Sequence, residues 1–592
     1  VSQIQLATAT DLPVQWRDYS VCDVVILAGQ FELNGEQSNA LRDWVRNGGH
    51  LIAAVGSRSS QLTASPLAEW ILENRTLTQR DVSDLSGFEL LSETEHRILF
   101  TRKPTGTSIE QTDGQTMITG IDGALLTRAS IGFGRVTLVG IDLDKNPMAR
   151  WRGLNPMLAR LTELAAVEVE TGQRRGRISE TGITDLGTQI QTGLENFPEI
   201  GTRSTLTVLE LVLLYLLIIG PADYFLVHRL LKRPRLTWVT FPVTVLLVGI
   251  LASSSAGSAN GHSLLVNQLD ILDIDTTTGH MRQSVWASLY SPANQRYRVE
   301  VDHRFHSLTG DAPESGVPID CWTAWSGVPE SNSGGMYRSG GLEVGRPRYT
   351  IGAQHQEITN LPVAVWSDRI VQSEATGLLE NSPVTVELTQ ASTGQLTLDS
   401  SITHHFAEPV DDWLIVYGNR VYFHRYTSGG GLADGTIAPG IAWHPGDARV
   451  GTQELRSYLT GLNFQRVEKS KGSGGSDFMT RRADWDSSSG DLFSVSRMIS
   501  LHELAGGSTY TGLSNSLLKH LELSQSLPLN RAVLIARFQL PTSTIHVNGE
   551  PVNVARRDAF VRLLLPVTDT ALASSLPDFD PNKKKQQPQT DQ

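Results

Sequence analysis

Two long apolar stretches interrupt a chain that otherwise mixes apolar and polar positions. They run from Leu206 to Val227 and from Leu236 to Ala252. At 1.5 Å per residue, about 20 apolar residues span a hydrocarbon core of ~30 Å, and the second stretch lies at the short end of that range. The pattern predicts a transmembrane helical hairpin over residues 205–256; a buried hairpin in a soluble core is the alternative. The turn between the stretches holds five basic or potentially basic side chains: His228, Arg229, Lys232, Arg233 and Arg235.

The charges around this hairpin predict its orientation. The excess of Lys and Arg in the turn places the turn in the cytoplasm, so that both flanking regions lie on the other side of the bilayer. We therefore expect an integral membrane protein with the lipid bilayer as a partner. The flanks carry acidic side chains that fit this arrangement: Glu195 and Glu199 before the hairpin, and Asp270, Asp273 and Asp275 after it.

Residues 1–165 alternate between patterns typical of strands and of helices. Asp23–Gly29 and His50–Gly56 are continuous apolar runs of the buried, parallel-strand type, and Gly35–Gly49 between them has one apolar helical face. These three segments predict a right-handed βαβ unit. Ala124–Asp142 predicts a hairpin with Gly132 and Gly134 at its turn, and a helix is expected over residues 155–164. We interpret this region as an α/β domain.

The pattern changes again beyond the hairpin. Short alternating strands with regular turns over residues 262–427 predict an antiparallel β-sandwich, and residues 441–570 mix strand and helix patterns. Residues 166–204 are expected to be a linker, and residues 577–592 a disordered tail. The predicted fold class is therefore multi-domain: α/β, a transmembrane α-hairpin, and mostly antiparallel, sandwich-like β.

Composition excludes several functional classes. The 592 residues carry a formal charge of −12, which argues against a general nucleic-acid binder, and two cysteines cannot form a disulfide framework. No phosphate-binding loop, zinc-protease, kinase or dinucleotide fingerprint is present, so no cofactor is expected. His404 and His405 are neighbours on an expected strand and point to opposite faces, which is unsuitable for a shared metal. Because the chain begins at Val1, we expect a signal or anchor helix upstream.

Part of the N-terminal region resembles the class I glutamine amidotransferase-like domain of bacterial envelope proteins. The resemblance rests on Asp11-Leu12-Pro13 with Trp16, Asp23–Gly29, Trp44–Gly49, Gly132–Val136 and Trp151–Leu154. It implies a nucleophilic cysteine on the turn after a central strand, with a His–Glu pair near the end of the domain. Here that turn reads Gly56-Ser57-Arg58-Ser59, Cys22 precedes a strand, and residues 142–146 contain no histidine. The domain is therefore expected to be catalytically silent, with Ser57 as an unconventional nucleophile in the alternative.

The hairpin resembles a family of uncharacterised bacterial integral membrane proteins. The likeness rests on Leu214–Phe225 and Arg233–Trp238, and it implies a bacterial inner-membrane location with large extracytoplasmic domains, but no activity. Pro221 and Pro242 should kink the two helices. Glu210 and Asp223 are either functional intramembrane acids or interfacial residues, with Arg229 as a partner for Asp223. The signature residues are Glu210, Tyr215, Gly220, Pro221, Asp223, Tyr224, Arg229, Arg233 and Trp238.

These observations favour a membrane-anchored envelope scaffold or binding module without a complete catalytic site. Its expected partners are the bilayer and proteins of the membrane or periplasm, and no nucleic acid. One alternative is a periplasmic amidotransferase-like hydrolase that uses Ser57. The other is an accessory subunit of a transport or secretion complex, with Glu210 and Asp223 lining a path.

Overall fold

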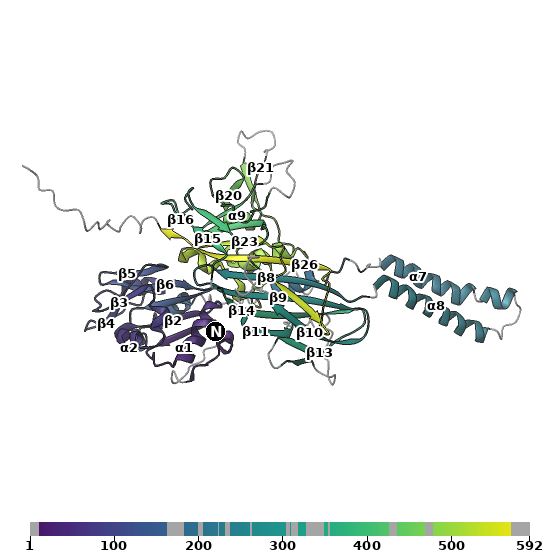
Figure 1. Cartoon of the computed structure of the whole chain (residues 1–592), viewed down its shortest axis with the longest axis horizontal. Coiled ribbons are helices and arrows are strands. Elements are labelled where there is room, and N and C mark those ends of the chain that lie inside the picture. The colour runs from purple at the N-terminus through teal and green to yellow at the C-terminus, as the bar shows by residue number, and fades with distance from the viewer. Residues whose placement is uncertain are drawn as a thin grey trace, which may run out of the picture.

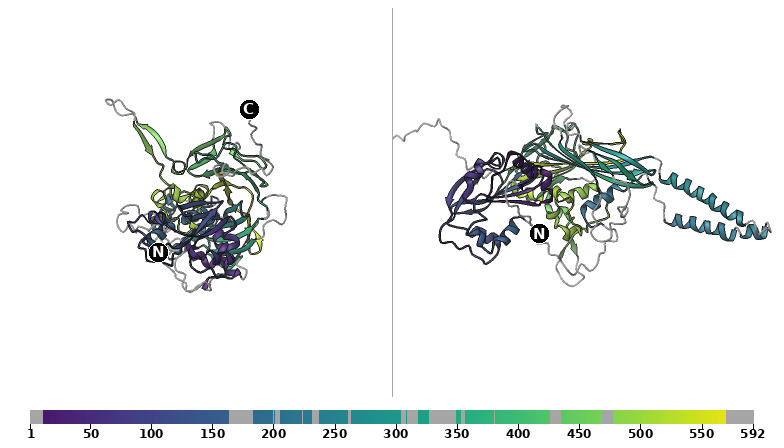
Figure 2. Two further views of the ribbon diagram at one scale, coloured as in Figure 1. Left: turned by 90° about the vertical axis from the view of Figure 1, so that its left-hand side faces the viewer. Right: turned by 90° about the horizontal axis from the view of Figure 1, so that it is seen from below.

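The N-terminal sheet lies beside a larger β-rich part, from which a pair of helices projects (Figures 1 and 2). The computed structural model describes residues 11–162, 183–198, 200, 205–222, 224–230, 237–260, 263–303, 308, 318–326, 349–352, 356–379, 381–425, 435–467 and 477–569.

The N-terminal sheet has five strands in the order β1-β2-β7-β6-β5. Strands β1 and β2 pair in parallel, as do β2 and β7, whereas β6 pairs antiparallel with both β7 and β5. The predicted strand–helix–strand order with parallel strands is confirmed, because α1 (Gly35–Arg46) connects the parallel strands β1 and β2. The predicted hairpin is also confirmed, with Gly132 at φ 61° in the turn between β6 and β7. The strands are β1 (Val24–Ala28), β2 (His50–Ala54), β5 (Gln115–Gly120), β6 (Gly123–Ile131) and β7 (Gly134–Val139).

Shorter elements cover this sheet. The expected helix near residue 155 is present as α5, and a capping box between Asn34 and Gln37 fixes the start of α1. These elements are η2 (Trp16–Val21), η3 (Gly56–Arg58), α2 (Ser59–Ala64), α3 (Ala68–Ile71), β3 (Arg75–Asp81), α4 (Ser86–Ser92), β4 (Thr105–Gln111), η4 (Met148–Arg150) and α5 (Leu154–Leu161).

The large sheet has nine strands in the order β11-β14-β9-β8-β26-β23-β18-β19-β20. All its neighbours pair antiparallel except β8 and β26, which are parallel. Strands from residues 265–424 and from the C-terminal region therefore share one sheet. They are β8 (Leu265–Asp275), β9 (His280–Ser291), β11 (Pro318–Trp325), β14 (Ser367–Leu378), β18 (Asp411–Tyr417), β19 (Arg420–His424), β20 (Val450–Glu454), β23 (Arg531–Arg537) and β26 (Arg556–Pro566).

The two faces of the large sheet are covered differently. On one face, Val266, Val285 and Leu289 pack against a small five-stranded sheet of order β12-β13-β10-β24-β25. On the other face, Leu269, Ile271 and Phe560 pack against short helices that include α6 and α10. The small sheet consists of β10 (Gln295–His303), β12 (Thr350–Ile351), β13 (Glu357–Val363), β24 (Ser543–Val547) and β25 (Glu550–Pro551).

Residues 166–204, expected to be a linker, contain α6 (Leu186–Leu194). Its Leu186 and Ile190 are buried in the core between the large sheet and the short helices. The remaining helices and strands are α9 (Leu455–Leu459), α10 (Leu492–Ser500), α11 (His502–Ala505), α12 (Ser508–Thr511), η11 (Lys519–Leu521), η12 (Ser524–Leu529), β15 (Val384–Glu387), β16 (Thr389–Gln390), β17 (Ser401–His404), β21 (Asn463–Val467), β22 (Asp477–Arg481) and β27 (Thr568–Asp569).

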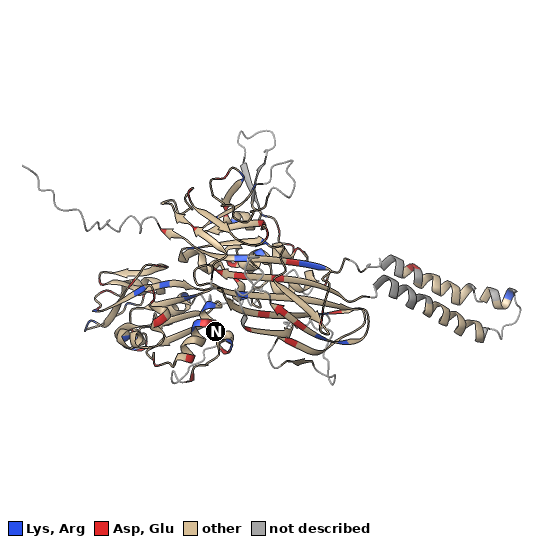
Figure 3. Cartoon of the chain, viewed as in Figure 1, with Lys and Arg blue, Asp and Glu red and all other residues tan. Residues whose placement is uncertain are grey.

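The projecting helices are α7 (Thr205–Leu217) and α8 (Thr237–Asn260), with π-helical segments η5 (Ile218–Ala222) and η6 (Phe225–Leu230) between them. Figure 3 shows few charged residues along these helices, and apolar side chains such as Leu216 and Ile250 are exposed. Among the described residues, no helix combines the length and the apolar character needed to cross a membrane. That finding contradicts the predicted transmembrane hairpin, the membrane-family resemblance and the inner-membrane location.

The predicted fold class is also wrong. The described residues form mainly β-sheets with short helices, and they do not show an α/β domain joined to a transmembrane hairpin. The acids used to orient the hairpin illustrate one physical reason. Asp270, Asp273 and Asp275 lie in β8 with at most 1% of their surface exposed, so they are sheet residues rather than solvent-facing flanks.

Candidate binding site

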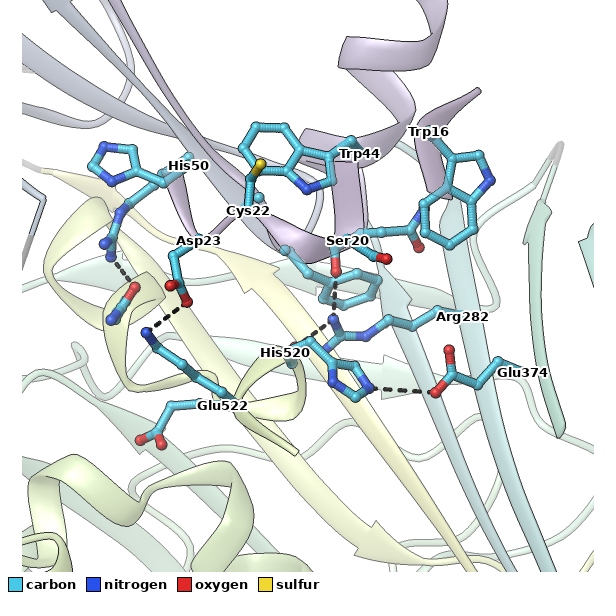
Figure 4. Close-up of a pocket in the computed structure, with 18 of the residues that line it drawn as sticks. Trp16, Ser20, Cys22, Asp23, Trp44, His50, Arg282, Glu374, His520 and Glu522 are labelled. Atoms are coloured by element: carbon cyan, nitrogen blue, oxygen red, sulfur yellow. Dashed lines mark hydrogen bonds and ion pairs between the residues drawn. The ribbon is translucent and has the colours of Figure 1, made fainter. Parts of the chain in front are cut away.

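A cavity of about 410 Å³ lies where the N-terminal sheet meets the large sheet (Figure 4). Its walls come from residues 16–50, from the β6–β7 turn and the start of β7, from Thr162, from strands β9, β11 and β14, and from residues 503–529. These segments are far apart in the sequence, so only the folded chain brings them together. Four large aromatic side chains contribute to the lining: Trp16, Trp44, Phe133 and Trp322.

Polar contacts fix the N-terminal segment against the rest of the molecule. Trp16 Nε1 donates a hydrogen bond to Asp320 Oδ2 at 2.9 Å, and Arg17 forms an ion pair with the same carboxylate at 3.1 Å. On another wall of the cavity, Lys519 Nζ lies 3.0 Å from Asp23 Oδ1. Hydrogen bonds and ion pairs therefore connect the N-terminal wall of the cavity both to β11 and to the C-terminal wall.

A row of three buried charged side chains crosses the large sheet behind the cavity. Arg562 of β26 is opposite Asp273 of β8, and Asp273 is opposite Arg282 of β9. Arg562 donates two hydrogen bonds to the Asp273 carboxylate, at 2.5 and 2.6 Å, and Arg282 Nε donates a third at 2.5 Å. Burial alone raises the pKa of Asp273, but the two guanidinium groups outweigh it and hold the pKa below its ordinary value.

Arg282 is the member of this row that lines the cavity, and it is 5% exposed. Its Nη1 donates to the carbonyl oxygens of Asn47 at 2.9 Å and His520 at 2.6 Å, and its guanidinium lies 4.3 Å from the centre of the Phe133 ring. Its Nη2 is buried and has no hydrogen-bond partner within the described part of the chain. A buried charged donor without an acceptor is costly, so this atom marks a place for one.

Two acidic side chains of the cavity wall already have partners. Glu374 accepts hydrogen bonds from Trp322 Nε1 at 3.2 Å and Gln372 Nε2 at 2.9 Å, and its Oε1 lies 3.6 Å from His520 Nε2. Glu522 accepts from Ser524 Oγ at 2.6 Å and Asn515 Nδ2 at 3.1 Å, and burial raises its pKa to about 7. At neutral pH Glu522 therefore carries only part of a negative charge.

Ser57, the candidate nucleophile of the alternative prediction, lies outside this cavity. Ser57 follows β2, and its Oγ donates a hydrogen bond to Asp142 Oδ2 at 2.7 Å while it accepts one from Lys145 Nζ at 2.8 Å. Asp142 also accepts from the Ser57 backbone N–H at 3.2 Å and lies 3.4 Å from Arg58. The carboxylate thus caps the turn after β2, and no histidine contacts Ser57 among the described residues.

The hairpin signature residues do not gather at a site. Glu210, Tyr224, Arg229 and Trp238 are exposed on the projecting helices, and Tyr224 stacks on His228 with ring centres 4.6 Å apart. Tyr215 is half-buried on α7, and Gly220 and Pro221 lie in η5. Asp223 and Arg233 lie outside the described residues. None of the seven signature residues that the structure describes lines the cavity.

Sequence reasoning missed the charged row. Its one signal was a lone charge within a strongly apolar strand, Arg562 in Ala559–Val567, whereas Asp273 gave none because Leu265–Asp275 also carries Asp270 and Asp275. The pairing itself could not be found, because Asp273 and Arg562 are 289 positions apart. Within the described ranges, no group of three or more His, Cys, Asp or Glu side chains is arranged to hold a metal ion.

Comparisons with known proteins do not place the chain in a family. No protein-family model matches it, and no curated protein matches it. The resemblances to the amidotransferase-like domain and to the uncharacterised membrane family are therefore not supported.

Comparisons with solved structures give weak similarities only. A cytoplasmic protein from Salmonella typhimurium is 13% identical, with a TM-score of 0.19, over 26% of this chain and 76% of that one. An exo-beta-1,4-mannosidase from Opitutaceae bacterium strain TAV5 is 17% identical, with a TM-score of 0.16, over 25% of each chain. The yeast delta-COP-I mu-homology domain is 7% identical, with a TM-score of 0.18, over 52% of this chain and 97% of that one. These TM-scores are too low to support any conclusion about fold or function.

Proposed function

We propose that this chain is a binding module that holds a small molecule in the cavity between the N-terminal sheet and the large sheet. The cavity carries the proposal. Its volume of about 410 Å³ lies within the range of roughly 300–1,000 Å³ typical of ligand sites, and aromatic side chains line it beside a few polar groups. A ligand there contacts segments from both ends of the chain, so binding also strengthens the joint between them.

A free thiol in the cavity wall gives a direct test. Cys22 lines the cavity and is half-buried, whereas Cys321 is buried. Ligands from a small-molecule library are expected to slow alkylation of Cys22 and to raise the melting temperature together, since both effects follow from occupancy of the cavity.

Two variants separate occupancy from other effects. Ser20→Trp adds a large side chain to the cavity wall and should abolish both responses. Val14→Trp, at an exposed position that does not line the cavity, should preserve them. If stabilising compounds leave Cys22 alkylation unchanged, or if no library compound slows it, the proposal is wrong.

Hydrolysis at Ser57 is a second candidate function, favoured by one observation. The Asp142 carboxylate lies 2.7 Å from the Ser57 hydroxyl and could accept its proton. However, the ammonium of Lys145 is 3.3 Å from the same carboxylate and donates a hydrogen bond to the Ser57 hydroxyl at 2.8 Å, so a lone pair of the serine oxygen is already engaged. We therefore expect a fluorophosphonate probe not to label the folded protein. Labelling that disappears in Ser57→Ala, while Ser59→Ala retains it, would establish the enzyme instead.

The transport-subunit alternative gains no support from the described residues. Glu210 is exposed on α7, away from the cavity, and Asp223 is not described.

A further inference from the structure

We infer that the ligand is a small molecule with one carboxylate and an apolar body, and that Arg282 binds the carboxylate. This inference rests on the proposed function and gives the chemical class of the ligand. Figure 4 shows Arg282 beside His520 and Glu374, with Trp16 and Trp44 supplied by the N-terminal segment.

The guanidinium group of Arg282 has one unused donor. Its Nε and Nη1 are occupied by Asp273, Asn47 and His520, whereas Nη2 has no acceptor among the described residues. A carboxylate is the acceptor that suits a guanidinium best, because the charge-assisted bond is short and about twice as strong as a neutral one. Nη2 has almost no water-accessible surface in the ligand-free protein, so a ligand oxygen reaches it through a small shift of the side chains that line the cavity and is then its first acceptor.

The charged row leaves an excess of positive charge at the cavity end. Two guanidinium groups share the single carboxylate of Asp273, and Arg562 already takes both of its oxygens. The three side chains stand on adjacent strands and are buried, which holds Arg282 in place before a ligand arrives. A preorganised cation with an unused donor selects for an anion.

The negative charge of Glu374, close to Arg282, favours an anion with a single negative charge. Glu374 faces Arg282 from the neighbouring strand β14 and contributes to its electrostatic environment. A phosphate dianion would meet this carboxylate with twice the repulsion of a monocarboxylate. The aromatic side chains of Trp16 and Trp44 provide apolar surface for the rest of the ligand.

The test compares benzoate, benzamide and inorganic phosphate as probes of the full chain, with binding measured by calorimetry and by Cys22 alkylation. Benzoate and benzamide have nearly the same shape and differ in charge. We expect benzoate to bind about tenfold more tightly than benzamide, which corresponds to about 1.4 kcal/mol for one charge-assisted contact, and more tightly than phosphate.

Substitutions then connect this preference to Arg282. Arg282→Gln should remove it and should still fold, because Asp273 keeps its two hydrogen bonds from Arg562. Arg282→Lys retains a cation beside Asp273 but lacks the forked donor, so it should also lose most of the preference. Arg298→Gln removes an equal charge from an exposed ion pair with Glu357, outside the cavity, and should leave the preference unchanged.

The outcomes distinguish the class of ligand from the existence of a site. Equal binding of benzoate and benzamide, or tighter binding of phosphate, overturns the carboxylate inference and leaves the binding module intact. A benzoate preference that persists in both Arg282 variants also overturns it. Failure of the whole library to slow Cys22 alkylation instead removes the proposed function.

Discussion

A single carboxyl group in the cavity wall, that of Glu522, should make stability depend on pH. Burial raises its pKa to about 7 in the folded protein, from an ordinary value near 4.5. Between these values the folded state binds more protons than the unfolded state, so stability falls as the pH rises from about 4.5 to 7. Glu522→Gln should remove this loss.

Between pH 5 and pH 8, the free energy of unfolding of Glu522→Gln should rise relative to that of the wild type by on the order of 2 kcal/mol, a figure reduced to allow for partial exposure. Urea unfolding at the two pH values measures the change. Glu36→Gln, at an exposed position of α1, serves as the control and should show no such gain. An unchanged difference between wild type and Glu522→Gln across this range would contradict the raised pKa.

At the scale of elements, the loss of stability on substituting the charged row across β26, β8 and β9 should depend on which of its three side chains is removed. Asp273→Asn leaves two buried guanidinium groups without a counter-ion, which typically costs about 3–5 kcal/mol. Arg282→Gln should cost clearly less, because a neutral ion pair remains. Glu93→Gln, in the exposed pair with Arg160, should change stability by less than about 1 kcal/mol. Chemical denaturation tests this order, and equal losses for Asp273→Asn and Glu93→Gln would refute it.

Elements whose signals are local could be predicted from the sequence. The apolar runs of β1 and β2 and the one-sided apolar pattern of α1 lie within a few dozen residues, and they gave the parallel unit correctly. The same reasoning misread β8. Its aspartates look like a solvated acidic flank when considered alone, yet Asp270 is held by Gln268, Thr542 and Ser543, and Asp273 by Arg562. Apart from Gln268, those partners are distant in the sequence.

The cavity could not be predicted for the same reason. It requires the N-terminal segment, the large sheet and residues 503–529 to meet, and no local pattern encodes that meeting. Ser57 was placed correctly on the turn after β2, but its neighbours Asp142 and Lys145 were not foreseen as partners. The single charge of an otherwise apolar strand is the one feature that could have directed attention to Arg562, and through it to Asp273.

At the scale of the whole molecule, acid should weaken the contact between the N-terminal region and the large sheet. His280 lies at their junction, where its Nε2 is 3.2 Å from Asn47 Oδ1. Burial, then the charges of Arg46, Arg282 and Arg42, lower its pKa to about 3. The unfolded chain binds this proton near pH 6.5, so the stabilisation is complete above that pH and is lost progressively as the pH falls toward 3.

In the Glu522→Gln background, where the opposite contribution of Glu522 is removed, thermal unfolding between pH 7.5 and pH 5 should therefore show a falling melting temperature, with a smaller fall when His280→Asn is added. His303, which is buried between the small and large sheets with its pKa lowered to about 4, should contribute a similar slope that His280→Asn does not remove. A flat profile in the Glu522→Gln background, or an identical slope with and without His280→Asn, would show that the junction is insensitive to acid.

The parallel pairing of β8 with β26 has a consequence for synthesis. Strand β8 leaves the ribosome long before its neighbour β26, which begins at Arg556, and β26 lies in the interior of the large sheet rather than at its edge. During translation, one edge of β8 therefore stays unpaired, and Asp273 has no hydrogen bonds from Arg562, until residues 556–566 have been synthesised. Loop closure over such a separation is slow, and an unpaired strand edge attracts other chains. A nascent chain stalled before Arg556 would thus lack the strand between β8 and β23 and would expose the unpaired edges of both. We expect chaperones to bind this form.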